Sequence, residues 1–249
     1  MLKIINLKKL YGRNTVIDDI SIEFGKGVFG LIGPNGAGKT TFIRILATVV
    51  KKDGGQIIYD NARNITEIRR MIGYLPQKFS LYGGLTVREG LSYIALMKEI
   101  PSDKMGIEVS RAIKEVNLDE KADERISSLS GGMKRRLGIA QAILGDPEII
   151  LVDEPTAGLD PEERIRFRRL IAGIGKEHTI IISTHIVEDV RSICDRIAVM
   201  NHGRIIENAS YEELLDKYRG HNTGNDTLYS SELERVYMRI IGEDDEEGC

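Results

Sequence analysis

The sequence contains few cysteines and no long uncharged apolar run. Its two cysteines, Cys194 and Cys249, lie far apart without the spacing of a paired set. We therefore expect reduced thiols in a cytosolic protein rather than a disulfide framework. No uncharged stretch approaches the roughly 18 residues that a membrane span requires. The amino terminus carries lysines but lacks the apolar core of a signal peptide. These absences predict a soluble chain, and any work at a membrane would need another polypeptide to cross it.

Neither sign of charge is in large excess. The formal net charge is -3, and the acidic run at residues 243–247 accounts for more than that excess. The rest of the chain is therefore close to neutral, which argues against a nucleic-acid backbone as the main partner. The length of 249 residues fits one large domain or a core with subsidiary lobes.

A glycine-rich turn directly follows an apolar run at residues 28–32. The segment GPNGAGKTT matches the P-loop pattern, in which backbone N–H groups and a helix start bind phosphate oxygens. Lys39 would contact the β and γ phosphates, and the Thr40 hydroxyl would contact a magnesium ion. The alternative, a chance match in an ordinary turn, is disfavoured by the strand before it and the amphipathic helix after it. The expected phosphate-binding residues are Gly33, Pro34, Asn35, Gly36, Ala37, Gly38, Lys39, Thr40 and Thr41.

Two further apolar strands end in polar residues. The strand at 148–152 leads into Asp153 and Glu154, and the strand at 179–184 leads into His185. Since α/β sheets bind ligands at the carboxyl ends of parallel strands, Asp153 is suited to bind magnesium through water. Glu154 is suited to polarise the water that attacks the γ phosphate, and His185 to donate to a phosphate. The alternatives are two acids that cap a turn and a histidine with a structural role.

A second glycine-containing helix start occurs in SLSGGMKRR, residues 128–136. Ser130 is placed to cap a helix whose first residues, Gly131 and Gly132, leave the backbone donors unobstructed. Basic residues follow closely, so this helix end has the chemistry of a second anion site. The alternative is an ordinary serine-capped helix with a basic face in solvent.

Antiparallel strands are expected near the amino terminus. Residues 3–8 and 16–24 alternate apolar and polar side chains, with turn residues between them. Tyr11 on their connection could stack on an adenine ring or could be a half-buried tyrosine. Short strands are also expected after the turn at residues 51–55 and before Gln77, which opens a loop.

Helical patterns dominate residues 86–145. Thr86 and Glu89 fit a capping box, and after Pro101 a second helix is expected over residues 107–118. We therefore expect a mainly helical insertion at about 86–145.

A hairpin is expected around His202 and Gly203. After about residue 220 the chain changes character, beginning with the polar linker GHNTGNDT. Ser231 and Glu234 can cap a helix, and we expect the acidic end at 243–247 to be disordered. That helix could dock on a partner, but packing on its own chain is favoured.

Taken in order, these motifs resemble the nucleotide-binding subunit of an ATP-binding cassette (ABC) transporter over residues 1 to about 215. The motifs are Tyr11, GPNGAGKT, YLPQ ending in Gln77, LSGGM at 129–133, IILVDE ending in Glu154, AGLD ending in Asp160, and STH ending in His185. The resemblance implies an α/β fold: a P-loop NTPase (RecA-like) core with an antiparallel β lobe and an inserted helical lobe. It assigns the nucleotide-binding domain to residues 1–219, leaving a linker, a short helix and an acidic tail at 220–249.

The resemblance also implies a dimer. In the family, two such domains sandwich two ATP molecules head to tail. Ser130, Gly131 and Gly132 would bind the γ phosphate held on the partner's P-loop, and Asp160 would run along the dimer interface. This arrangement explains why one chain has two phosphate-binding helix ends far apart in sequence.

Catalytic and metal-binding roles follow by position. The resemblance implies that Tyr11 stacks on adenine, that Glu154 is the general base and that His185 helps to place the attacking water. The expected catalytic residues are Lys39, Gln77, Glu154 and His185, and the expected ligands around Mg2+ are Thr40, Gln77 and Asp153.

One departure from the common pattern points to a subfamily. The signature ends in Met133 where many members have glutamine, and SGGM followed by KRRLGIAQA resembles the ABC-2 type exporter subfamily. These ATPases pair with a separate membrane permease subunit at the cytoplasmic face of the membrane. The loop after Gln77 would contact that subunit through exposed Phe79, Leu81 and Tyr82.

Two other functional classes fit less well. A cassette ATPase acting on DNA or the ribosome would usually carry a long coiled coil or a tandem second cassette. A P-loop kinase or GTPase would not explain LSGGM. We therefore expect an ATPase whose partners are a second copy or a homologous ATPase subunit and a permease, with no nucleic acid.

Overall fold

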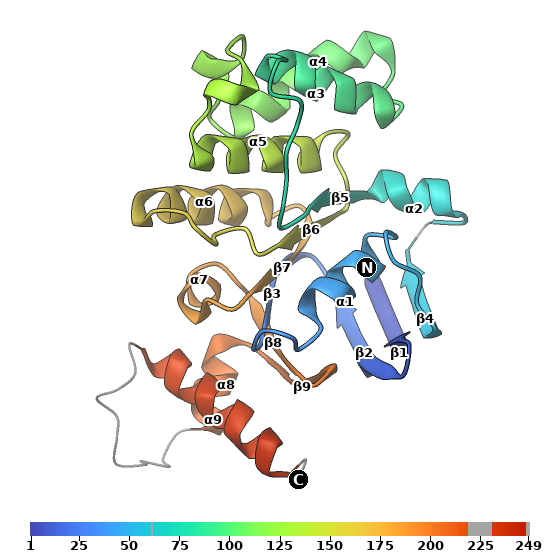
Figure 1. Cartoon of the computed structure of the whole chain (residues 1–249), viewed down its shortest axis with the longest axis vertical. Helices are drawn as coiled ribbons and strands as arrows, with labels where there is room; N and C mark the ends of the chain where they lie inside the picture. Colours follow the sequence, from blue (N-terminus) through green and yellow to red (C-terminus); the bar gives the residue numbers. More distant parts are fainter. Residues whose placement is uncertain (61, 219–230, 248–249) are drawn as a thin grey trace.

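A six-stranded sheet forms the middle of the molecule (Figure 1). The structure is a computed structural model and describes residues 1–60, 62–218 and 231–247. The strand order is β5-β6-β7-β3-β8-β9. Neighbours from β5 to β8 run parallel, and β9 pairs antiparallel with β8 at the edge. The strands are β3 (Gly27–Ile32), β5 (Ile72–Leu75), β6 (Ile149–Asp153), β7 (Thr179–Thr184), β8 (Arg196–Asn201) and β9 (Arg204–Ala209). Because β6 and β7 are buried along their whole length, they read as continuous apolar runs in the sequence.

A separate three-stranded sheet lies beside the core, with the order β2-β1-β4. It consists of β1 (Leu2–Tyr11), β2 (Asn14–Phe24) and β4 (Gly54–Tyr59), and both pairings are antiparallel. Along β1, Leu2, Ile4 and Leu7 are buried and their neighbours are more exposed. This alternation covers one face of the sheet with core, as expected for an antiparallel lobe.

Helices form the upper part of the molecule in Figure 1. They are α3 (Val87–Met97), α4 (Ser102–Glu115), the short 3-10 turns Asp119–Lys121 and Ile126–Ser128, and α5 (Gly131–Ile143). The capping box of Thr86 and Glu89 is confirmed. Helix α4 begins at Ser102 rather than at the expected residue 107, because Pro101 ends the preceding segment and then occupies the N-cap position itself.

Helix α1 (Lys39–Leu46) begins after the P-loop, as the sequence predicts, and α6 (Pro161–Ile174) begins directly after Asp160. Three short helices were not expected: α2 (Ile65–Met71), α7 (Val187–Arg191) and α8 (Tyr211–Lys217). Two of them carry capping signals in the sequence. Asn64 accepts from the backbone of Thr66 and Glu67 at the start of α2, and Ser210 forms a capping box with Glu213 at the start of α8.

The expectation of a disordered acidic end is wrong, because helix α9 (Glu232–Glu247) continues through it. Leu233, Val236 and Ile240 of α9 are buried in a core cluster shared with α7 and α8, so the helix packs on its own chain. At its acidic end, the Asn201 side chain donates to Asp244 over 2.9 Å and to Asp245 over 3.0 Å. These contacts give the carboxylates fixed partners. The expected polar linker lies outside the described residues.

The central sheet separates two apolar cores. Val28, Ile150 and Ile180 face the core shared with the helical part, whereas Leu151 and Ile181 face the core shared with the antiparallel sheet and α1. The alternation follows from the two-residue period of strands. No described helix combines the length and the apolar content that a bilayer span needs.

Candidate functional site

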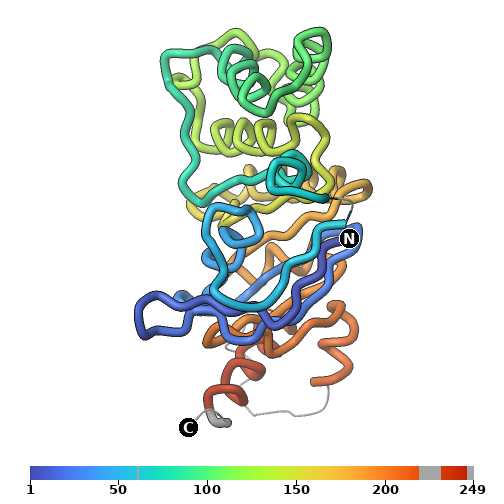
Figure 2. Tube along the Cα trace, turned by 90° about the vertical axis from the view of Figure 1, so that its right-hand side faces the viewer, coloured from blue at the N-terminus to red at the C-terminus, as the bar shows by residue number. Residues whose placement is uncertain are grey.

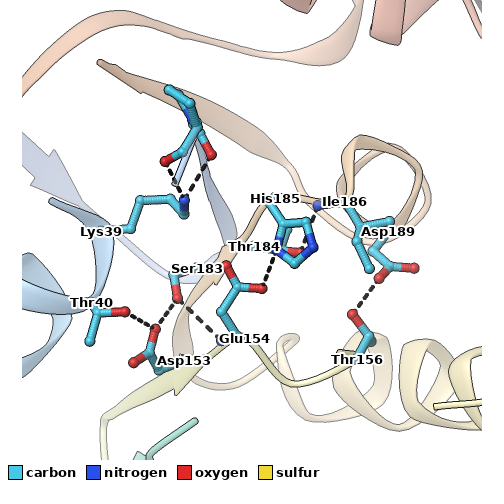
Figure 3. A network of polar contacts seen from close by, with 12 residues as sticks. Lys39, Thr40, Asp153, Glu154, Thr156, Ser183, Thr184, His185, Ile186 and Asp189 are labelled. Atoms are coloured by element: carbon cyan, nitrogen blue, oxygen red, sulfur yellow. Dashed lines mark hydrogen bonds and ion pairs between the residues drawn. The ribbon is translucent and has the colours of Figure 1, made fainter. Parts of the chain in front are cut away.

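The carboxyl ends of β3, β6 and β7 bring five of the predicted site residues together (Figure 3). Lys39 and Thr40 follow β3 in the P-loop and the first turn of α1. Asp153 ends β6, Glu154 follows it, and His185 follows β7. Three strands that are adjacent in the sheet thus place these five side chains at one edge, where parallel sheets bind ligands.

The P-loop backbone is shaped for close approach. Gly38 has a φ of 106° and forms the N-cap of α1 without any side-chain cap, so the first N–H groups of the helix are available to an anion. A Cβ on Gly33 would lie 2.1 Å from the carbonyl oxygen of Met200. Only glycine allows the loop to pass this close to β8. The Gly203 N–H donates to the Ala37 carbonyl over 3.0 Å, so the β8–β9 turn is hydrogen-bonded to the P-loop.

The side chain of Lys39 folds along the P-loop. It is only 6% exposed, and its Nζ donates to the carbonyls of Gly33 at 2.7 Å and Pro34 at 3.0 Å. Burial lowers the pKa of this ammonium, while the nearby carboxylates of Glu154 and Asp153 act in the opposite direction. The ammonium is thus held by carbonyls of the P-loop, with the two carboxylates nearby.

Thr40 and Asp153 form an oxygen pair suited to magnesium. The Thr40 hydroxyl donates to Asp153 Oδ1 over 3.1 Å, and the same oxygen accepts from Ser183. A hydroxyl and a carboxylate fit Mg2+, which commonly takes one or two carboxylates together with substrate phosphates. Gln77 stands apart from this pair: its side chain is exposed and has no hydrogen bond to Thr40 or Asp153 in the described part of the chain. Ser183 belongs to the STH motif, but only His185 of that motif was assigned a role from the sequence, because the contact of Ser183 with Asp153 joins two distant segments.

Glu154 and His185 are direct partners. Nδ1 of His185 lies 2.8 Å from Oε2 of Glu154, whose side chain is almost fully buried. Glu154 has a φ of 47°, which is unfavourable for a residue other than glycine. Its N–H donates to the carbonyl of Ser183 at 3.0 Å. The turn after β6 therefore holds a carboxylate in a strained backbone, a feature common at functional sites.

The signature residues lie on a different part of the molecule. Ser130 caps α5 by accepting from the Met133 N–H over 3.2 Å, and Gly131 faces open space. A Cβ on Gly132 would come within 2.5 Å of the Glu163 carboxyl on α6, so a larger residue here would displace that side chain. Figure 1 shows α5 in the upper half and α1 in the lower half. No hydrogen bond joins the signature to the P-loop within the described residues, so this chain does not bring the two together.

Asp160 and Tyr11, the two other predicted site residues, lie at the start of α6 and at the end of β1. Asp160 caps α6 by accepting from the Glu163 N–H over 2.9 Å. Tyr11 ends β1 on the hairpin that projects at the lower left of Figure 2. The residue is 49% exposed, and Lys9 Nζ lies 5.2 Å from the centroid of its ring. About half of Tyr11 is therefore accessible, and its stacking on adenine stays a prediction.

The basic residues behind the signature are not simply a solvated face. Arg135 points into the protein and donates to backbone carbonyls near Gln77 and Glu154. Arg136 is buried and donates to the carbonyls of Val116 and Asn117 at the end of α4. A charge run alone does not reveal such contacts, because their carbonyl acceptors are distant in sequence.

Comparisons with known proteins agree with this site. The ABC transporter family model matches residues 17–157. Linearmycin resistance ATP-binding protein LnrL of Bacillus subtilis is 34% identical over 225 residues, covering 88% of this chain and 72% of that protein. Nod factor export ATP-binding protein I of Bradyrhizobium diazoefficiens is 35% identical over 247 residues, covering 96% of this chain and 81% of that protein.

A solved structure supports the same assignment. A dimeric ATP-binding cassette in a post-hydrolysis state, bound to ADP and Pi, superposes with a TM-score of 0.74 at 25% identity, covering 84% of this chain and 98% of that one. Both the expected fold and the expected family are thus confirmed. This chain is a member of the ABC transporter family, an ATP-binding and ATP-hydrolysing cassette built on a P-loop core.

Proposed function

We propose that this chain is the ATPase subunit of an exporter, in which two copies close around two ATP molecules and drive a separate membrane permease. The observation that carries the proposal is the convergence of Lys39, Thr40, Asp153, Glu154 and His185 at one edge of the sheet. We assign the nucleotide-binding domain to residues 1–219, with the helical lobe at about 86–145, and place the chain on the cytoplasmic face of the membrane.

In this proposal, the P-loop backbone and Lys39 bind the triphosphate, and Tyr11 stacks on the adenine. Thr40 and Asp153 would hold the magnesium ion. Gln77 would become the third protein residue beside the ion after its side chain moves toward Thr40 and Asp153. The chemistry that this ion supplies when bound is neutralisation of charge on the β and γ phosphates. Glu154 accepts a proton from the attacking water.

His185 completes the catalytic group. With Nδ1 directed at the Glu154 carboxylate, Nε2 is on the far side of the ring, and it donates to the γ phosphate when both ring nitrogens carry a proton. The partner lobe is needed as well, because Ser130, Gly131 and Gly132 lie away from the chain's own P-loop. A second copy in head-to-tail orientation would place these donors on the γ phosphate.

The export direction rests on the relatives, whose names denote Nod factor export and linearmycin resistance. The proposed contact with the permease is the loop after Gln77. Tyr82 is 77% exposed there, but Phe79 and Leu81 pack partly against the helical core, contrary to the expectation that all three are exposed. These two residues instead line a hollow of about 160 Å³ beside Lys134 and Leu137. Tyr82 and this hollow form the proposed docking surface.

The test uses Glu154→Gln in the full chain. We expect this variant to bind ATP, to lose steady hydrolysis and to elute as a dimer with ATP, because the nucleotide bridges two copies until its γ phosphate is removed. Size-exclusion chromatography and phosphate release measure both effects. A monomer with undiminished phosphate release would contradict the general base and the sandwich together.

Lys39→Ala is the companion variant. It should lose ATP affinity by roughly 10- to 100-fold, since hydrogen bonds to charged groups contribute about 1.5–3 kcal/mol, and it should therefore stay monomeric. Lys52→Ala is the matched control, because Lys52 donates to the Gly55 carbonyl at an exposed position away from the site.

A further inference from the structure

All the hydrogen bonds that Arg135 makes in the described structure end on backbone carbonyls. This arginine is on the second turn of α5, and its partly buried side chain reaches the central sheet. Nε donates to Pro155 at 2.7 Å, Nη1 to Pro76 at 3.3 Å and Gln77 at 3.0 Å, and Nη2 to Asp153 at 3.0 Å and Glu154 at 2.6 Å. Every nitrogen of the guanidinium is therefore used.

The acceptors belong to two segments that are far apart in sequence. Pro76 and Gln77 follow β5, whereas the others end β6 and begin the turn after it. A planar guanidinium with five N–H donors can join two such segments, and it stays charged at any physiological pH. The nearby Asp153 and Glu154 favour its charge, although burial lowers the pKa of Arg135.

The C-terminal part of helix α5, the helix that carries Arg135, is fixed against β5. Gln141 Nε2 donates to the Tyr74 carbonyl over 2.6 Å. A Cβ on Gly73 would lie 2.1 Å from the Ala142 carbonyl, so strand and helix backbones are in direct contact. The helix cannot shift without moving β5 or breaking these contacts.

The backbone of Glu154 is held from both sides. Its N–H donates to Ser183 and its carbonyl accepts from Arg135. Since its φ of 47° is a strained value, such external contacts are needed to maintain it. Loss of the arginine would release the peptide group that follows Glu154, and the direction of the carboxylate depends on that backbone.

We propose that Arg135 is a positioning residue for ATP hydrolysis, fixing the backbones of Glu154 and Gln77 relative to helix α5. The proposal rests on the general-base role of Glu154 given above. The same helix begins with the signature residues that would contact the partner's nucleotide. Arg135 therefore links the helix end that binds one ATP to the carboxylate that acts on the other.

The test compares Arg135→Gln and Arg135→Lys in the full chain. We expect Arg135→Gln to lower kcat by roughly 10- to 100-fold, as small misplacements of catalytic groups do, with the Kd for ATP changed by less than about 3-fold. Arg135→Lys should be intermediate, because one ammonium reaches fewer carbonyls. Arg88→Gln is the control, since Arg88 forms an exposed ion pair with Asp123 in the same helical part.

A double variant separates positioning from a general structural role. Because Arg135 acts through Glu154, Arg135→Gln should change the residual hydrolysis of Glu154→Gln by less than about 2-fold. An equal loss in both backgrounds, an unchanged kcat, or a kcat loss matched by lost ATP affinity would overturn the proposal. If Glu154→Gln alone hydrolyses ATP at the normal rate, the general-base assignment fails instead, whatever the effect of Arg135→Gln.

Discussion

His185 and Glu154 face each other across the ends of two adjacent strands, with 2.8 Å between Nδ1 and Oε2. The Glu154 side chain is 8% exposed, whereas 48% of the histidine side chain is accessible. The pair thus joins a buried carboxylate to an accessible ring, and the protein holds the imidazole through one of its two nitrogens. Its other nitrogen, Nε2, makes no hydrogen bond in the described part of the chain and is left for the phosphate.

We expect His185→Ala to lower kcat by about 100-fold, within the usual range for a group that assists proton transfer, and to leave ATP affinity nearly unchanged. Phosphate release and nucleotide titration measure the two quantities. His202→Asn is the matched control, because His202 is exposed, has a φ of 44° that asparagine tolerates, and lies outside the catalytic group. A normal kcat for His185→Ala would argue against its contact with the γ phosphate.

Tyr11 offers a separate test of adenine binding. Tyr11→Ala should weaken ATP binding by about 1–3 kcal/mol, the usual loss when base stacking is removed, whereas Tyr11→Phe should keep it. Inorganic triphosphate has no base, so its affinity should be the same for all three proteins. Titration calorimetry with both ligands checks this. An equal loss of triphosphate binding would mean that Tyr11 acts on the P-loop rather than on the base.

Replacing two different glycines by alanine should change stability in opposite directions. In Gly73→Ala, the new methyl group would lie 2.1 Å from the Ala142 carbonyl, so we expect a loss of about 1–3 kcal/mol. In Gly173→Ala, the new methyl group of α6 meets nothing within 4 Å, and we expect a gain of about 0.5–1 kcal/mol. Urea unfolding gives both values. Similar changes in the two variants would contradict the close packing of α5 on β5.

The buried side chain of Lys98 should make the stability of the protein depend on pH. Its Nζ donates to the Leu144 carbonyl over 2.7 Å, and burial lowers its pKa to about 8, from 10.5 for an ordinary lysine. Between these values, the unfolded chain binds a proton that the folded chain has released, so the folded state gains stability as pH rises. Below pH 8 both states carry the proton and the effect is constant.

The measurement compares the wild type with Lys98→Met at pH 7.5 and 9.5. The free energy of unfolding of the wild type, minus that of the variant, should increase with pH by at most about 1.4 kcal/mol per unit. The other titrating groups are common to both proteins and cancel. A constant difference, or one that decreases, would show that the folded state keeps this lysine protonated.

Local sequence patterns predicted the strands and several helix starts. The apolar runs before Lys39, Asp153 and His185 identify buried parallel strands, and the caps at Thr86 and Ser130 identify helix starts. In each case the signal is complete within about ten residues. The candidate site followed because all these strands end at the same edge of one sheet.

Contacts between distant segments could not be predicted in this way. The acidic end continues helix α9, and its Asp244 and Asp245 accept hydrogen bonds from Asn201, more than forty residues away. Arg135 looked like part of a basic surface, since its acceptors are backbone carbonyls that carry no sequence signature. The short helices α2 and α8 do have local caps, and attention to the Asn64–Glu67 and Ser210–Glu213 spacings would have found them.

The division of the apolar interior by shared strands has a consequence for attempts to dissect the protein. Alternate side chains of β6 and β7 complete the core under the helices and the core under the antiparallel sheet. Each lobe therefore packs on strands that the other lobe also needs. Neither lobe can be excised as an independently folding fragment. Loosening of β6 or β7 would reach both lobes at once, so the two should unfold as one cooperative unit.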